Sequence, residues 1–369
     1  MKKAVSKRLG IVDLWRFVFS IVIMLGHMYY IIPGVNASGR LYGGGAVYVE
    51  FFFILSGYFA ANHILGERGH NGTTLSPNNK DEEVNNYARL SVIYVWNKFK
   101  RMLPYIWTSV LWMFIVKIVR VESHFKRNFI YFAEKAVCSM LLITSTGFGS
   151  TSADKTDALN PPMWYLSAMF LALPVVCMLL MNKKTRRVYA YYLVWLLPLC
   201  WYGSHGMVIR KAFPDDIVRA FCSLSLGVLV YQISVWLKGR NFSRAAKAAL
   251  TALELGCVGV TLIFTIRWFD WNALIIVLFV IMTSIMLSGQ SATAGIHGKF
   301  FDYLGGLSLI VYLFHWPVFQ LLRYIKVNSA ALGYLIYSVG TVALSAVIFG
   351  IGTVISRNIK KHKAVRRAV

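Results

Sequence analysis

The feature that most constrains the fold is a series of apolar stretches, each long enough to cross a lipid bilayer. A transmembrane helix needs about 20 predominantly apolar residues, and such stretches recur from one end of the chain to the other. We expect spans at residues 10–32, 45–65, 103–120, 163–181, 188–203, 217–237, 248–268, 273–288, 304–322 and 332–355. The sequence therefore predicts an all-α membrane protein with about ten transmembrane helices in a single domain.

Composition excludes the soluble globular class. Hydrophobic residues make up 57% of the chain and charged residues only 15%, whereas about a quarter of the residues in an average soluble domain are charged. The first apolar stretch lacks a small-residue cleavage site, so we interpret it as a retained span and not as a signal peptide. We therefore expect a multi-pass protein whose main partner is the lipid bilayer.

The net charge of +24 is concentrated in clusters that border the apolar stretches. These clusters lie at residues 2–8, 98–101, 183–187, 238–247 and 357–367. Basic residues next to spans mark the cytoplasmic side of a membrane protein, which explains the charge without a nucleic-acid partner. Because both termini are basic, we expect both in the cytoplasm, and this requires an even number of crossings.

Three segments outside the spans complete the predicted topology. Residues 66–100 form a cytoplasmic loop and residues 356–369 a basic cytoplasmic tail. Residues 121–162 form an extracytoplasmic loop, in which the apolar stretch 136–146 is too short to cross the bilayer. We expect an interfacial or re-entrant helix at 128–147.

The first span carries polar residues that are costly inside a membrane and are therefore functional candidates. Arg16 and His27 are eleven positions apart, so on a helix they differ by only about 20° in direction and about 16 Å in height. Asp13 and Ser20 lie one turn on either side of Arg16. The alternative is structural: Asp13 and Arg16 form an ion pair near the inner interface, and His27 is hydrogen-bonded between helices.

Further candidates lie at two other spans. Glu50 is within expected reach of His27, where a carboxylate would fix the imidazole tautomer and raise its basicity. Lys98 and Arg101 lie one turn apart at the cytoplasmic end of the third span and suit a phosphate group, although they also suit ordinary membrane anchoring. His315 precedes the kinking Pro317 and is as consistent with a structural role as with a functional one.

Four motifs in order resemble the acyltransferase-3 family of bacterial membrane O-acyltransferases over nearly the whole chain. The family's Arg-x10-His signature is similar to Arg16 and His27, and its FFxLSGf pattern to Phe52–Tyr58. Its RxxRxxP pattern is similar to Lys98–Pro104, and its SxxxYLxH element to Ser308–His315. Four motifs at suitable distances form a strong combined signal.

Two positions depart from the family pattern. Lys98 replaces an arginine, which keeps the charge but loses bidentate phosphate geometry. The family's WSLxxE opening appears as Trp164–Met169 without its glutamate, so no role of that carboxylate can be transferred. No esterase-like domain follows the last span, and we expect a stand-alone membrane module.

The resemblance implies transfer of an acyl group, most often acetyl, from cytoplasmic acyl-CoA to a sugar hydroxyl. The acceptor would be a surface glycan or its lipid-linked precursor, and the protein would lie in the bacterial inner membrane. Lys98 and Arg101 would hold the CoA phosphates, and Arg16 would line the channel for the pantetheine arm. His27 would activate the acceptor hydroxyl or carry the acyl group transiently.

The remaining candidates have less specific roles. Glu50 or Asp13 would orient a catalytic partner, and Trp164, Tyr312 and His315 would contact the acceptor. We expect no metal and no tightly bound cofactor, because thioester acyl transfer needs only a base and oxyanion stabilisation, and because the five cysteines form no CxxC or Cys/His cluster.

Two other classes of function remain open from the sequence. Charges inside the membrane serve equally well in a transporter or flippase that moves a small solute or a lipid-linked sugar. A structural subunit of an envelope assembly is the third alternative. The sequence carries no indication of the oligomeric state.

Overall fold

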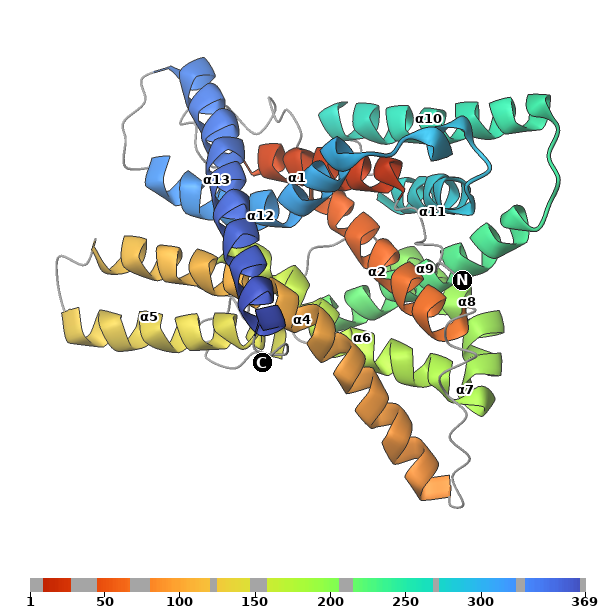
Figure 1. Cartoon of the computed structure of the whole chain (residues 1–369), viewed down its shortest axis with the longest axis horizontal. Coiled ribbons are helices and arrows are strands. Elements are labelled where there is room, and N and C mark those ends of the chain that lie inside the picture. The colour runs from red at the N-terminus through yellow and green to blue at the C-terminus, as the bar shows by residue number, and fades with distance from the viewer. Residues whose placement is uncertain are drawn as a thin grey trace.

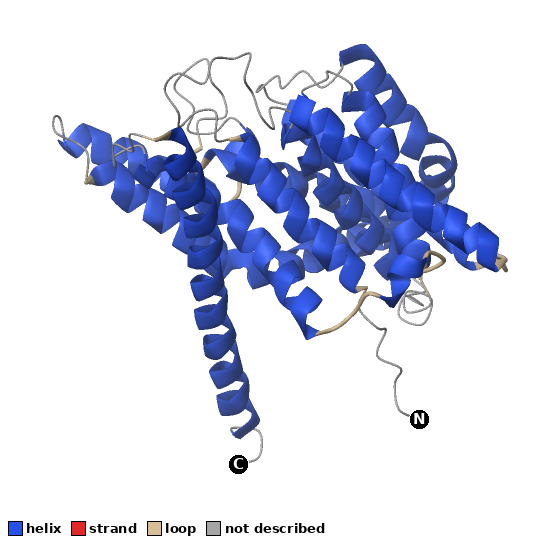
Figure 2. Ribbon diagram, turned by 90° about the horizontal axis from the view of Figure 1, so that it is seen from above, coloured by secondary structure: helices blue, strands red, loops and turns tan. Residues whose placement is uncertain are grey.

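The structure, a computed structural model, describes most of the chain, and what it describes is almost entirely helical. The described residues are 9–27, 45–66, 80–119, 125–146, 158–205, 215–267, 272–322 and 329–365. Within these ranges no residue lies in a strand. The all-α prediction is confirmed for this part of the chain (Figure 2).

The described helices follow the apolar stretches closely. They are α1 (Gly10–Gly26), α2 (Tyr48–Leu65), α4 (Lys80–Ile118), α5 (Phe125–Met140), α6 (Trp164–Met181), α7 (Lys183–Val188), α8 (Val194–His205), α9 (Asp215–Lys238), α10 (Arg244–Arg267), α11 (Asn272–Ser288), α12 (Lys299–Leu322) and α13 (Ala330–Val365). A short π-helical segment, Tyr189–Leu193, joins α7 to α8, and the 3-10 turns η3 (Gly45–Val47) and η5 (Pro161–Met163) precede α2 and α6.

Six helical segments in the described ranges are long and apolar enough to span a membrane, and α11 is a shorter apolar helix. These six contain α2, α6, α9, α10, α12 and α13. Their length and composition are those of a multi-pass membrane protein. The count of ten spans and the cytoplasmic position of both termini stay predictions.

α4 extends far beyond the span expected from hydropathy. α4 begins at Lys80 and runs without interruption to Ile118, so the later part of the expected loop 66–100 is helical. Its residues 80–100 contain neither glycine nor proline, and nothing there stops a helix. α5 lies alongside the C-terminal half of α4 (Figure 1) and overlaps the helix expected at 128–147. Its interfacial or re-entrant position stays a prediction.

The centre of the fold is the crossing of α1, α2, α9 and α12 (Figure 1). Aromatic rings fill the space between α1, α2 and α11: Phe19 packs against Tyr48 and Phe51 with ring centroids 4.7 Å apart. α2 and α9 approach closely because a glycine lies on each. A Cβ at Gly57 would lie 2.0 Å from the carbonyl oxygen of Leu224, and a Cβ at Gly227 only 2.2 Å from that of Ile54.

α13 lies at the edge of the helix bundle and packs mainly along α12 (Figure 1). Its candidate span is only 11% buried, and its exposed side chains are largely apolar. They include Leu335, Val339, Val347, Ile351 and Val354. Such a surface is compatible with lipid and incompatible with water.

Candidate active site

Asp13 and Arg16 form an ion pair within α1. The Arg16 guanidinium donates to the Asp13 carboxylate over 3.0 Å, and Asp13 is only 2% exposed. The carboxylate fits against α12 because Gly305 faces it: a Cβ at that position would lie 2.0 Å from a carboxylate oxygen. The ion pair considered as an alternative from the sequence is therefore present, and it keeps Arg16 oriented inside the bundle.

His27 ends α1 with a defined ring orientation. Its Nδ1 lies 2.9 Å from the Ile23 carbonyl oxygen. A carbonyl can only accept, so Nδ1 donates, and in the neutral ring the lone pair is then on Nε2. The ring lies 5.1 Å from the His315 ring and 5.5 Å from that of Trp316, centroid to centroid. The structure thus pairs two histidines that are far apart in sequence.

His315 is a fully buried histidine with free hydrogen-bonding capacity. It is 0% exposed, and neither ring nitrogen has a hydrogen-bond partner by distance and angle, although the Val311 and Tyr312 carbonyls of its own helix lie near the ring. A buried polar group without a partner is costly. An arrangement of this kind is expected where a ligand completes the bonding.

A row of neighbouring side chains connects this histidine pair to Ser56 of α2 and Lys98 of α4. The Tyr312 ring packs at a tilt against His315, with ring centroids 5.8 Å apart, and edge-to-face against Tyr165, with ring centroids 5.5 Å apart. The Tyr312 hydroxyl donates to the Pro162 carbonyl over 2.6 Å. The Tyr165 side chain is buried and interacts in turn with Ser56 and with the Arg16 charge.

Lys98 lies at the other end of this row. Its ammonium donates to the Ser56 hydroxyl over 3.0 Å. The positive charge of Arg16 is close enough to repel that of Lys98. Arg101, one turn further along α4, is exposed. The two cations expected to act together therefore differ: Lys98 points towards the row of polar side chains, whereas Arg101 lies on the surface.

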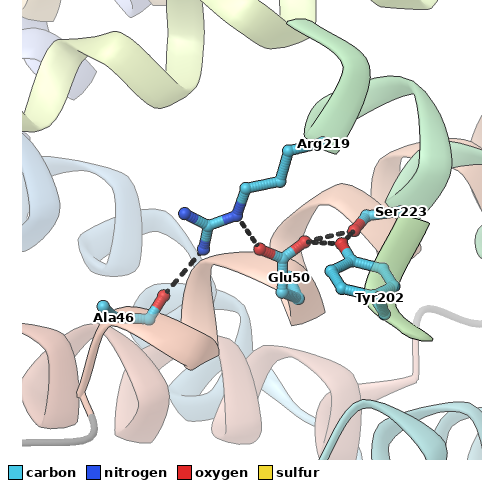
Figure 3. A network of polar contacts seen from close by, with 5 residues as sticks. All are labelled: Ala46, Glu50, Tyr202, Arg219 and Ser223. Atoms are coloured by element: carbon cyan, nitrogen blue, oxygen red, sulfur yellow. Dashed lines mark hydrogen bonds and ion pairs between the residues drawn. The ribbon is translucent and has the colours of Figure 1, made fainter. Parts of the chain in front are cut away.

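Glu50 has a different environment from the one expected. It is fully buried and accepts hydrogen bonds from Arg219, Ser223 and, over 3.0 Å, the Tyr202 hydroxyl (Figure 3). The contacts of Glu50 thus go to α8 and α9 and not to His27. The expectation that Glu50 orients His27 is corrected, because the α2–α9 crossing places the carboxylate next to Arg219.

Arg219 also contacts Trp164, the residue proposed to contact the acceptor. Its guanidinium lies 4.9 Å above the Trp164 ring and donates to the Ala46 carbonyl over 3.3 Å (Figure 3 shows the latter bond). Trp164 is half-buried at the start of α6. Glu50 thereby fixes the arginine that supports the indole ring.

Three residues of this network were missed from the sequence: Arg219, Ser223 and Tyr202. Arg219 lies within the expected span 217–237, so the cost of a charge in a membrane could have marked it. Ser223 and Tyr202 carry no comparable signal, because hydroxyl side chains are common in spans. Residues 147–157 of the expected extracytoplasmic loop 121–162 lie outside the described residues.

No metal centre is formed by the described part of the chain, where no three His, Cys, Asp or Glu side chains are grouped closely enough to hold an ion. The arrangement instead offers an oriented imidazole next to a second imidazole, together with an inward-pointing cation. These groups are suited to moving a proton and to binding an anion.

Comparison with known proteins agrees with this chemistry. A family model described as an acyltransferase domain matches residues 9–350. No curated protein and no solved structure matches the chain. The match covers nearly the whole chain, including all the site residues described above.

Proposed function

Because this chain belongs to the acyltransferase-3 family, we propose that it is a membrane O-acyltransferase that moves an acyl group, of acetyl type, from cytoplasmic acyl-CoA to a hydroxyl of a surface glycan or its lipid-linked precursor. The observation that carries this proposal is a row of side chains in contact. It runs from Lys98 through Ser56, Met169, Tyr165 and Tyr312 to the paired histidines. We place the protein in the bacterial inner membrane.

The two ends of the row suit the two substrates. Lys98 is held inward by Ser56 on a helix whose start we expect on the cytoplasmic side, so its charge can contact a CoA phosphate. The thioester arm would extend past Arg16 towards His27. Trp164 and the His315 ring would contact the sugar, because an aromatic face packs well against the apolar face of a sugar ring.

His27 is the proposed base. Its Nε2 removes the proton of the acceptor hydroxyl, the oxygen attacks the thioester carbonyl carbon, and the carbon–sulfur bond breaks. The proton then passes to the CoA thiolate, so that an ester and free CoA are the products. In the covalent variant, Nε2 attacks the thioester carbonyl carbon and the carbon–sulfur bond breaks, which leaves an acylated imidazolium and the CoA thiolate. The acceptor hydroxyl oxygen then attacks the acyl carbon, the bond to Nε2 breaks, and the hydroxyl proton passes to the thiolate, so that the products are again an ester and free CoA.

The direct test uses purified protein in lipid nanodiscs with acetyl-CoA labelled in its acetyl group. We expect saturable binding of acetyl-CoA and release of free CoA thiol, because a base close to a bound thioester supports transfer to an acceptor or slow transfer to water. A protein that binds no CoA at all would contradict the acyltransferase proposal. That outcome would favour the transporter alternative.

The Lys98→Met variant tests the cytoplasmic end of the row. We expect KM for acetyl-CoA to rise about tenfold or more, since a hydrogen bond to a charged group contributes about 1.5–3 kcal/mol, while kcat changes less. Lys100→Met is the matched control, because Lys100 is exposed on the same helix. Lys98→Arg keeps the charge and should keep the affinity. Equal effects of the two methionine variants on KM would reject the assignment.

A further inference from the structure

The turn of α12 that carries His315 has an unusual main-chain defect. In an α-helix the N–H of residue 317 would donate to the carbonyl of residue 313, but Pro317 has no N–H. The Leu313 carbonyl therefore loses its helical donor. Inside an apolar helix bundle such a carbonyl needs a donor from elsewhere.

Two side chains from other segments provide that donor. Asn160 Nδ2 donates to the Leu313 oxygen over 3.0 Å, and the Ser109 hydroxyl donates to the same oxygen over 3.1 Å. Asn160 Nδ2 also donates to Ser109 Oγ over 2.7 Å, so all three groups are joined. Asn160 and Ser109 are both 0% exposed.

The same segment is connected to α12 a second time. The Tyr312 hydroxyl donates to the Pro162 carbonyl over 2.6 Å. Tyr312 directly precedes Leu313, and in this bond the donor belongs to α12, whereas in the first bond the donor is Asn160. Asn160 itself begins the η5 turn through its carbonyl, which accepts from Met163 N–H over 3.0 Å, and α6 starts one residue later with Trp164. Residues 160–164 are thus fixed to the turn that carries His315.

We propose that Asn160 and Ser109 are positioning residues, which hold the proline-freed turn of α12 so that His315 and Trp316 face His27. They act on the main chain of Leu313 and not on substrate. Because Asn160 also leads into Trp164, the same contact keeps the acceptor-side indole in register with the histidine pair. The catalytic part of this proposal rests on the proposed function, whereas its structural part does not.

The test combines Asn160→Ala with Pro317→Ala. In Asn160→Ala we expect amide hydrogen exchange in residues 313–320 to accelerate about tenfold, the size expected for one buried hydrogen bond. We also expect kcat to fall about tenfold with KM for acetyl-CoA unchanged. In Pro317→Ala the N–H of residue 317 can donate to Leu313, so adding Asn160→Ala to that background should change either quantity by less than about twofold.

The controls keep each outcome decisive. Ser109→Ala removes the other donor to the Leu313 oxygen and should give an effect of the same kind, and it serves if Asn160→Ala does not fold. Asn62→Ala, at an exposed position of α2, should change neither exchange in residues 313–320 nor kcat. A loss of kcat in Asn160→Ala of the same size on both backgrounds would overturn the proposal, because Asn160 would then act on substrate. Unchanged exchange in residues 313–320 would overturn it as well.

The exchange measurement needs no turnover, so the two proposals can fail separately. If the wild-type protein transfers no acyl group but Asn160→Ala still loosens residues 313–320 and Pro317→Ala suppresses that change, the positioning role stands and the acyltransferase proposal fails. If transfer occurs and the exchange is unaffected, the positioning role alone fails.

Discussion

Replacing His27 with alanine is expected to lower the rate of acyl transfer by a factor of about 10²–10⁴, the usual contribution of a positioned acid–base group. The reason is geometric. Nδ1 is bonded to the Ile23 carbonyl, which leaves Nε2 as the ring atom with a lone pair. His315, 5.1 Å away between ring centroids, is buried in a different turn and cannot take the same position. The measurement is the release of CoA thiol from acetyl-CoA in the presence of acceptor, with folding checked by size-exclusion chromatography.

His63→Ala is the matched control for this experiment. His63 is exposed in the last turn of α2 and stacks on Tyr94, away from the histidine pair, so its loss should leave transfer unchanged. Wild-type rates in His27→Ala would exclude His27 as both base and acyl carrier. Incubation with labelled acetyl-CoA and no acceptor separates the two mechanisms: label bound to the wild-type protein but not to His27→Ala indicates the covalent variant.

The helices of this protein were largely predictable because hydropathy and length decide them. A stretch of about 20 apolar residues has few alternatives to a helix in a membrane, and α6, α9, α10 and α12 begin and end within a few residues of the expected spans. α4 was less predictable. Its polar first half is helical as well, which hydropathy cannot indicate because it reports membrane depth and not backbone conformation.

Side-chain contacts were predictable within one helix but not between helices. The spacing of Arg16 and His27 placed them on one face of α1, and the same argument placed Asp13 next to Arg16, as the structure confirms with the ion pair. The His27–His315 pairing depends on α1 packing along α12, which periodicity does not determine. Asn160 was equally inaccessible from the sequence, because its role depends on a carbonyl that Pro317 frees on another helix.

Glu50 shows the limit most clearly. The sequence marked it correctly as a costly carboxylate in a span but assigned it to the wrong neighbour. Gly57 and Gly227 lack side chains and therefore allow α2 and α9 to approach closely. This approach places Glu50 next to Arg219. Helix crossings with small residues at the contact are common in membrane proteins, yet one glycine in each of two helices does not identify the pair.

The second large effect is expected at this buried network. Glu50→Gln removes the charge that balances Arg219 while keeping the size of the side chain. Arg219 then stays buried without the carboxylate that it contacts directly, and breaking a buried pair in this way typically costs about 3–5 kcal/mol of folding free energy. We expect the detergent-solubilised variant to unfold at a clearly lower temperature, measured as loss of the monodisperse chromatographic peak after heating. Glu134→Gln on the exposed side of α5 is the control and should have little effect.

A double-mutant cycle separates the ion pair from general loss of packing. Arg219→Met alone should be as destabilising as Glu50→Gln, because it leaves the carboxylate buried with only the hydroxyls of Tyr202 and Ser223 (Figure 3). The double variant removes both charges of the Glu50–Arg219 pair together, so it should be less destabilised than the sum of the two single variants. Its transfer rate should nevertheless stay low, since Trp164 has lost the guanidinium 4.9 Å above its ring. Additive losses of stability would show that the charges are not coupled, and a double variant with a normal transfer rate would show that Arg219 does not support Trp164 during the reaction.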